Sequence, residues 1–187
     1  MNTMKMNIVR LFFLFGFFWI SLYSNSQDNQ LSRQEQKEVR KAQRVENFYV
    51  LDSLLNGKSF VLEADYLQNK YGDRVPVTST LNFIKVDKSK GVLQTGSDIR
   101  MGTNGVGGVT AEGSIGAWEI SKNLKTLSHT VRFSLLTSIG NFDIFMTVSA
   151  DNYASATITG STSGRLSWNG HLRSINNSRV FKGQNTI

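Results

Sequence analysis

The hydrophobic rhythm of this chain changes once, near residue 58, and that change limits what the chain can fold into. Before it, apolar residues recur at helical spacing; from Ser59 onward they alternate with polar ones along most segments. Period-two alternation is typical of strands with one buried face, and turn residues recur at intervals suited to an antiparallel meander. The sequence therefore predicts a mainly β protein of the α+β class, with a single antiparallel meander sheet, curved or barrel-like, and one N-terminal helix packed on it.

The predicted helix begins at a capping box, Ser32-Arg33-Gln34-Glu35, in which the side chains of Ser32 and Glu35 each bond the backbone amide of the other. Gly57 predicts its end, because glycine readily adopts the left-handed conformation that stops a helix. One stripe of the helix carries the apolar residues Leu31, Val39, Ala42, Val45 and Tyr49.

The first predicted strand places Phe60, Leu62, Ala64 and Tyr66 on one face. Further strands are predicted around 77–87, 91–95, 113–121, 126–137, 142–149, 154–158 and 165–173. The last residues, 176–187, either add a short edge strand through Val180 and Phe181 or fray.

Large aromatic side chains recur in these predicted strands. Such rings form a core, but in a β-barrel they also line a mouth that holds an apolar ligand, and the sequence leaves both roles open. The residues are Tyr66, Phe83, Trp118, Phe133, Phe142 and Trp168.

The first 26 residues predict export. Lys5 and Arg10 precede an apolar run, 11–20, and the small residues of Ser24-Asn25-Ser26 follow, as in a cleavable signal peptide. The run is shorter than the roughly 20 residues that a membrane-spanning helix needs. We therefore expect 1–26 to be a signal peptide and 27–187 a single domain without a transmembrane segment, located in the periplasm or outside the cell.

Composition narrows the chemistry. The chain has no cysteine, which excludes disulfides, thiolate metal sites, cysteine nucleophiles and a lipid-bearing cysteine after the leader. Loss of Lys5 and Arg10 lowers the formal charge from +7 to +5 (7 − 2), and export argues against a nucleic-acid partner. No acidic residue follows Asp151. Basic residues do follow it, and they are either solvated strand residues or a patch for anionic glycans or lipid headgroups: Arg165, Arg173, Arg179 and Lys182.

The glycine-rich stretch 96–113 is the one long irregular element. Its spacing, and the lack of a following helix, exclude a dinucleotide fingerprint. Glycine permits positive φ, so the stretch predicts a long hairpin or an Ω-loop, and long loops inside compact domains are often functional. The candidate ligand-binding residues are Asn104, Gly105, Gly107, Gly108 and Thr110, with Arg173 and Arg179 as contacts for an anionic group.

No pattern predicts a catalytic or metal centre. Glu63 and Asp65 share one face of a predicted strand, which suits either acid–base chemistry or a solvated outer face. His129 and His171, the two histidines, have no second ligand at a metal-like offset. We therefore expect no catalytic residue, no metal site and no cofactor.

Three stretches carry a family resemblance: LLNGKSFVLEA (54–64), NGVGGVTAEG (104–113) and SRVFKG (178–183). Together they resemble an uncharacterised exported family of Bacteroidetes-type bacteria, domain of unknown function 4251, over most of the chain after the leader. The resemblance implies an envelope or secreted location in a Gram-negative cell and a helix followed by a mostly β domain. It implies no catalytic residue.

These observations predict a non-enzymatic periplasmic protein that binds a small molecule, glycan or lipid, or that supports the envelope. One alternative is a hydrolase acting on envelope polymers through carboxylates such as Glu63, Asp65 or Glu112. The other is a structural or assembly partner whose helix docks on an envelope protein. An exposed apolar stripe on the helix would favour docking.

Overall fold

The computed structural model describes residues 32–97, 104–160 and 165–186, so the predicted signal peptide lies outside the described part. The chain divides after Glu38 into two compact units. In the first, the described residues 32–38 hold the start of helix α2 (Arg33–Asn56). The second holds the rest of α2 and the sheet. No helix within the described ranges combines the length and the apolar character of a membrane span.

α2 begins and ends at the predicted residues, but the left-handed residue that follows it is Lys58, with a φ of +48°, and not Gly57. The backbone N of Ser32 donates to Glu35 Oε2 at 2.7 Å, and the backbone N of Glu35 donates to Ser32 Oγ at 3.3 Å. Hydrogen bonding of the Glu35 carboxylate to Ser32, mainly to its side chain and then to its backbone N, lowers the pKa of Glu35. At the other end, Gly57 N donates to Ser53 O at 2.9 Å, immediately after the helix.

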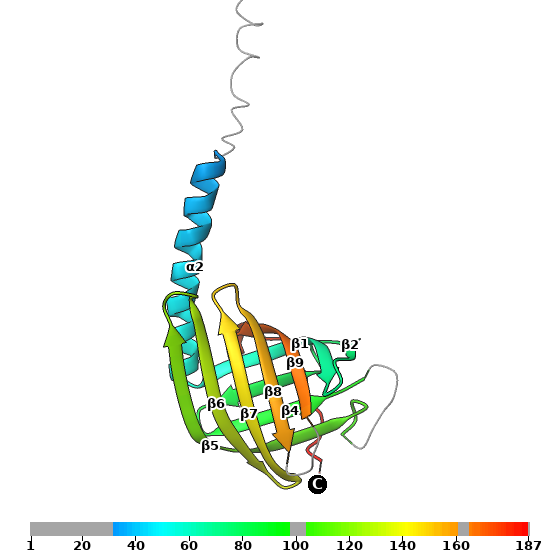
Figure 1. Ribbon diagram of the computed structural model, residues 1–187. Coiled ribbons are helices and arrows are strands. Elements are labelled where there is room, and N and C mark those ends of the chain that lie inside the picture. The colour runs from blue at the N-terminus through cyan, green and yellow to red at the C-terminus, as the bar shows by residue number, and fades with distance from the viewer. Residues whose placement is uncertain (1–31, 98–103, 161–164, 187) are drawn as a thin grey trace, which may run out of the picture. The chain divides into compact units, whose positions relative to one another are not determined.

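The strands form one antiparallel sheet that closes on itself (Figure 1). Its order is β2-β1-β3-β4-β5-β6-β7-β8-β9, and an additional pairing joins β9 back to β1, so eight strands make a closed barrel. The expected antiparallel meander is confirmed. The bounds are β1 (Ser59–Asn69), β2 (Arg74–Pro76), β3 (Phe83–Asp87), β4 (Lys90–Thr95), β5 (Val109–Asn123), β6 (Ser128–Thr137), β7 (Gly140–Ser149), β8 (Tyr153–Gly160) and β9 (Arg165–Arg173).

A bulge in β1 changes which residues face the core. The pairing of β1 with β9 shifts between Ala64 and Tyr66, so two residues of β1 stand where one is expected. After the shift, Leu67 packs against the core and Tyr66 is 45% exposed. The expectation that Tyr66 faces inward is therefore wrong.

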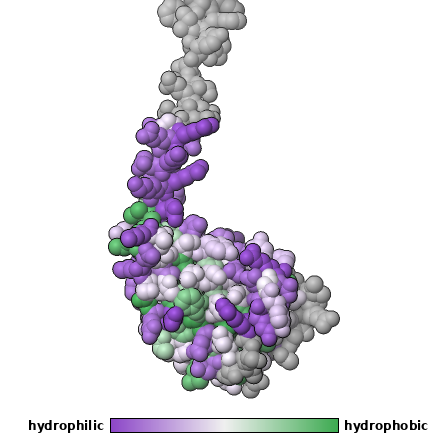
Figure 2. All heavy atoms as spheres, viewed as in Figure 1, coloured by the Kyte–Doolittle hydropathy of each residue, from purple (hydrophilic) through white to green (hydrophobic). Residues whose placement is uncertain are grey.

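The C-terminal half of α2 covers one end of the barrel. Phe48, Leu51 and Leu55 are buried, and the two leucines belong to the same core cluster as the inward residues of the strands. The stripe expected to be buried is instead exposed at Val39 and Tyr49. Figure 2 shows the visible surface of α2 as mostly hydrophilic, with hydrophobic side chains gathered towards its barrel end.

The C-terminal segment, residues 174–186, lies on the outside of the barrel. It begins with the short helix η2 (Ile175–Asn177). Ile175 and Val180 then pack on a cluster of outward-facing residues from β1, β3 and β4, namely Val61, Phe83 and Val92. The segment is tied down along its length by hydrogen bonds without forming a strand, so neither the expected edge strand nor fraying describes it.

Candidate functional site

A cavity of about 430 Å³ lies at one end of the barrel, and we call it the mouth cavity. Its described lining comes from β4, β5, β7, β8 and β9 and includes Arg165, the first residue of β9. The other end of β9, from His171 to Arg173, lines a separate groove together with Asn47 and Leu54 of α2. The mouth cavity and α2 therefore lie at opposite ends of the barrel.

The wall of the mouth cavity is a continuation of the barrel core. Side chains alternate inward and outward along each strand, and the inward ones at this end leave space between them. The buried or partly buried core residues of the wall are Leu93, Ala111, Phe142, Ile158, Leu166 and Trp168. Of the two roles that the aromatic residues suggested, Phe142 and Trp168 fill both, since they pack in the core and line the cavity.

Two hydrogen-bond donors belong to this apolar wall. Trp168 is 1% exposed, and its buried Nε1 has no acceptor among the described residues. Arg165 is exposed, and no carboxylate of the described ranges lies within ion-pair distance of it.

The glycine-rich stretch borders the mouth cavity at both of its ends. Thr95 and Val109 line the cavity, and they are paired as the last residue of β4 and the first of β5. The predicted residues between them serve the loop itself. Asn104 is buried, and its Oδ1 accepts from the backbone N of Val106 at 3.1 Å and of Gly108 at 3.0 Å.

The candidate glycines also have local structural reasons. Gly105 and Gly107 have φ near +74°, a left-handed conformation that side chains disfavour. Gly108 is required for close packing instead, since a Cβ there would lie 2.2 Å from the carbonyl oxygen of Thr95. None of these three is in the described lining of the mouth cavity.

Thr110 belongs to a buried polar cluster under the C-terminal segment. The Oγ1 of Thr110 donates to Gln94 Oε1 at 2.9 Å. Gln94 Oε1 also accepts a hydrogen bond from the backbone N of Gly183 at 2.8 Å. Gln94 Nε2 donates to the carbonyl oxygens of Leu81 and Phe181. Gln94, which is fully buried, therefore connects β4, β5 and the C-terminal segment.

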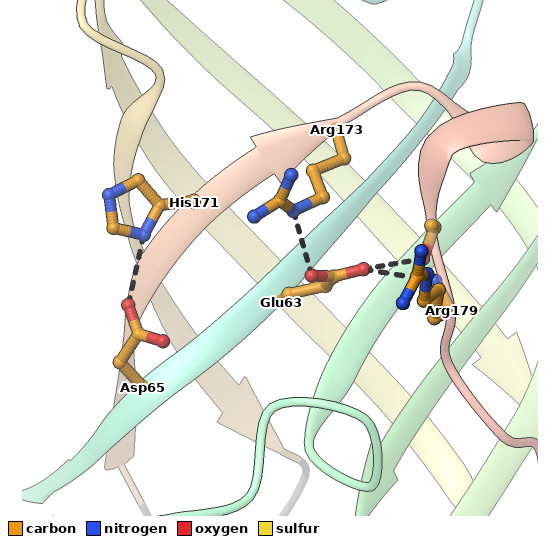
Figure 3. A network of polar contacts seen from close by, with 6 residues as sticks. Glu63, Asp65, His171, Arg173 and Arg179 are labelled. Atoms are coloured by element: carbon orange, nitrogen blue, oxygen red, sulfur yellow. Dashed lines mark hydrogen bonds and ion pairs between the residues drawn. The ribbon is translucent and has the colours of Figure 1, made fainter.

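The two arginines of the predicted site meet at one carboxylate, as Figure 3 shows. Arg173 Nε donates to Glu63 Oε2 at 2.9 Å, while Glu63 Oε1 accepts from Ser178 Oγ at 2.7 Å and from the backbone N of Arg179 at 3.4 Å. The side chain of Glu63 is 12% exposed. The structure therefore joins Arg173 and Arg179 to each other through Glu63, and neither is part of the described lining of the mouth cavity.

The other carboxylates weighed for hydrolysis are also paired with bases. Asp65 Oδ2 lies 3.0 Å from His171 Nδ1, and Glu112 forms an ion pair with Lys182 of the C-terminal segment. Glu63 and Glu112 thus hold the C-terminal segment from two strands. Two of the basic residues near the C-terminus, Arg173 and Lys182, therefore form ion pairs within the protein.

At the α2 end, a polar pair lies inside the apolar contact. His129 is buried, Phe48 stacks on its ring with centroids 4.4 Å apart, and its Nε2 lies 3.2 Å from Asp52 Oδ1. Burial lowers the pKa of His129, against the opposing effect of Asp52. Burial opposes the charge of Asp52, but hydrogen bonds from Lys122 and His129 outweigh it and lower the pKa of Asp52.

No three His, Asp or Glu side chains of the described residues gather as a metal-binding group. Of the wall of the mouth cavity, the sequence singled out Phe142 and Trp168 but not Leu93, Ala111 or Leu166, because these three carry no polar or aromatic signal. The only sequence signal for these residues was their place in the alternating pattern of the predicted strands, which puts them on the inward face.

Comparison with known proteins gives one family. A family model described as "Domain of unknown function (DUF4251)" matches residues 42–172, a range that includes every described lining residue of the mouth cavity. A crystal structure of a DUF4251 family protein from Bacteroides eggerthii is similar, with a TM-score of 0.61 and 30% identity, covering 72% of this chain and 92% of that chain. A search of the curated proteins found no match.

Proposed function

Because the chain belongs to the DUF4251 family, which is defined only as a domain of unknown function, we propose a role from the barrel itself: a non-enzymatic, exported binding protein that holds a small apolar molecule in its mouth cavity. The observation that carries this proposal is the apolar cavity of about 430 Å³ at the barrel end away from α2. This volume lies within the roughly 300–1,000 Å³ of typical small-molecule sites.

One further feature supports binding at this end. α2 and its buried leucines fill the opposite end, so the space is not a channel through the barrel.

Titration with Nile red, a neutral apolar dye that fluoresces when it leaves water, tests the proposal on the full chain. We expect saturable binding, and we expect Ala111→Phe to weaken it about tenfold or more, because the added ring would occupy the mouth cavity. Thr147→Phe is the matched control, since Thr147 is exposed on β7 and adds the same ring outside the cavity.

Thermal unfolding shows whether Ala111→Phe still folds. If the larger ring prevents folding, Ala111→Leu fills less of the same space and should weaken binding by a smaller factor. Equal dye binding by wild type and by a folded Ala111 variant, or no saturable binding by wild type, would contradict the proposal.

A second candidate, docking of α2 on an envelope protein, is favoured by one observation. Val39, Tyr49 and Val50 are 52%, 61% and 53% exposed, so apolar groups of the helix remain open to a partner. Crosslinking from a photoreactive residue at position 49 in intact cells would test this candidate, and an absence of adducts would count against it.

A further inference from the structure

We infer that the ligand of the mouth cavity is an anionic amphiphile with one alkyl chain, whose head group meets Arg165 at the rim. This inference rests on the proposed function and adds the chemical class of the ligand. It follows from the charges around the cavity and from its size.

Arg165 is the only charged residue in the described lining of the mouth cavity. Of the other basic residues that the sequence grouped with it, Arg173 and Lys182 form ion pairs with Glu63 and Glu112. Arg179 bonds Glu63 through its backbone N and does not line the mouth cavity. Within the described ranges Arg165 has no such carboxylate.

A guanidinium group beside an apolar wall fits a ligand with two chemically different ends. Its planar fork of N–H donors matches a carboxylate or a phosphate in a two-point contact, while the hydrocarbon is covered by the wall. A cationic ligand would meet repulsion from Arg165 and no carboxylate in the described lining.

The size of the cavity favours one chain. About 430 Å³ is near the lower end of the usual range of small-molecule sites, roughly 300–1,000 Å³, which suits a single alkyl chain better than a lipid with two. A free fatty acid and an alkyl phosphate share this chemistry, and the experiment separates them.

The test is displacement of Nile red from the full chain by three ligands of equal chain length: decanoate, decyl phosphate and decanol. We expect at least one of the anions to compete about tenfold or more better than decanol, because Arg165 can form charge-assisted hydrogen bonds with an anionic head group and not with a neutral alcohol. Preference for decanoate would indicate a fatty acid, and preference for decyl phosphate a phosphate headgroup.

Arg165→Gln should reduce that preference to about twofold or less while leaving Nile red and decanol binding unchanged. Lys125→Gln is the matched control, because Lys125 is exposed in the turn between β5 and β6 and its loss removes the same charge elsewhere. It should keep the preference.

The outcomes separate the two proposals. If Nile red does not bind, the proposed function fails. If Nile red and decanol bind but neither anion competes better, the mouth cavity stands and the anionic ligand is wrong. If the preference survives Arg165→Gln, the assignment of the head group to Arg165 is wrong.

Discussion

Asp52 Oδ1 lies 3.2 Å from Nε2 of His129, so a carboxylate on α2 and a buried imidazole on β6 form a polar contact inside the apolar junction of helix and barrel. The residues are 77 positions apart in the chain. The contact therefore reports on whether the helix is seated.

This pair predicts a pH dependence of stability. The pKa of His129 is lowered in the folded protein, so as the pH falls below the ordinary histidine value, about 6.5, the unfolded chain takes up a proton that the folded protein does not. Stability present above about pH 6.5 is then lost on acidification. We expect the free energy of unfolding to fall between about pH 7 and about pH 5.

Denaturant unfolding at the two pH values measures this loss. His129→Gln should remove most of the loss, while His171→Gln, which changes a histidine whose side chain is 50% exposed, should keep it. The range from about pH 7 to about pH 5 lies above the titration of Asp52, whose lowered pKa affects stability only below about pH 4. An unchanged pH dependence in His129→Gln would contradict this assignment.

The buried leucines of α2 predict that the helix contributes to the stability of the barrel. Leu51 is 1% exposed in the main core, so Leu51→Ala should lower the free energy of unfolding by about 2–5 kcal/mol. Val50 is the neighbouring residue and is 53% exposed, so Val50→Ala should change it by less than about 1 kcal/mol. Similar values for the two variants in urea unfolding would mean that the helix does not close this end in solution.

The hydrogen bonds of Gln94 to Phe181 and Gly183 predict that this side chain holds the C-terminal segment on the barrel. Gln94→Leu removes a buried amide and leaves the N–H of Gly183 and the carbonyl oxygens of Leu81 and Phe181 without that partner, at a cost of about 2–4 kcal/mol. We also expect faster proteolysis of residues 174–186 in this variant.

Gln68→Leu is the control for that experiment, because Gln68 makes one exposed bond to the carbonyl oxygen of Gly72. Its cost should stay below about 1 kcal/mol. If both variants resist protease as well as wild type does, Gln94 does not fasten the segment.

Much of the fold could be predicted from local patterns. The capping box at Ser32 predicts the start of the helix, and the change of period at Ser59 predicts the start of the first strand. Each signal lies within a few neighbouring residues, and both predictions are confirmed. The predicted strands 142–149 and 154–158 leave room for a tight turn between them, and the structure has one at Asp151-Asn152, with Asn152 at a φ of +67°.

Irregularities of the strands could not be predicted as readily. In β5 the inward residues change from Ala111 and Ile115 to Trp118 and Ile120, because the pairing with β6 shifts between Gly116 and Glu119 and Ala117 takes a φ of +44°. Such a bulge bends a strand around a barrel, and in the sequence it looks only like a break in alternation. The predicted strand 77–87 likewise begins only at Phe83.

The candidate site was predicted only in part, through the aromatic residues Phe142 and Trp168 of its wall and the glycine-rich stretch at its edge. Glycines were the visible signal, and they reflect backbone geometry at Gly105 and close packing at Gly108. The wall of the mouth cavity depends on barrel closure by β1 and β9, a pairing between distant parts of the chain that no local pattern encodes.

The most direct measurement of the central claim is quenching of Trp168 fluorescence by a decanoate brominated along its chain. The chain has three tryptophans, so Trp19→Phe with Trp118→Phe leaves only Trp168 on the cavity wall, and Trp19→Phe with Trp168→Phe leaves only Trp118, which packs near Phe60 and Lys58. We expect saturable quenching of the Trp168 protein and little quenching of the Trp118 protein. Equal quenching of both, or no saturable quenching of Trp168, would contradict a ligand in the mouth cavity.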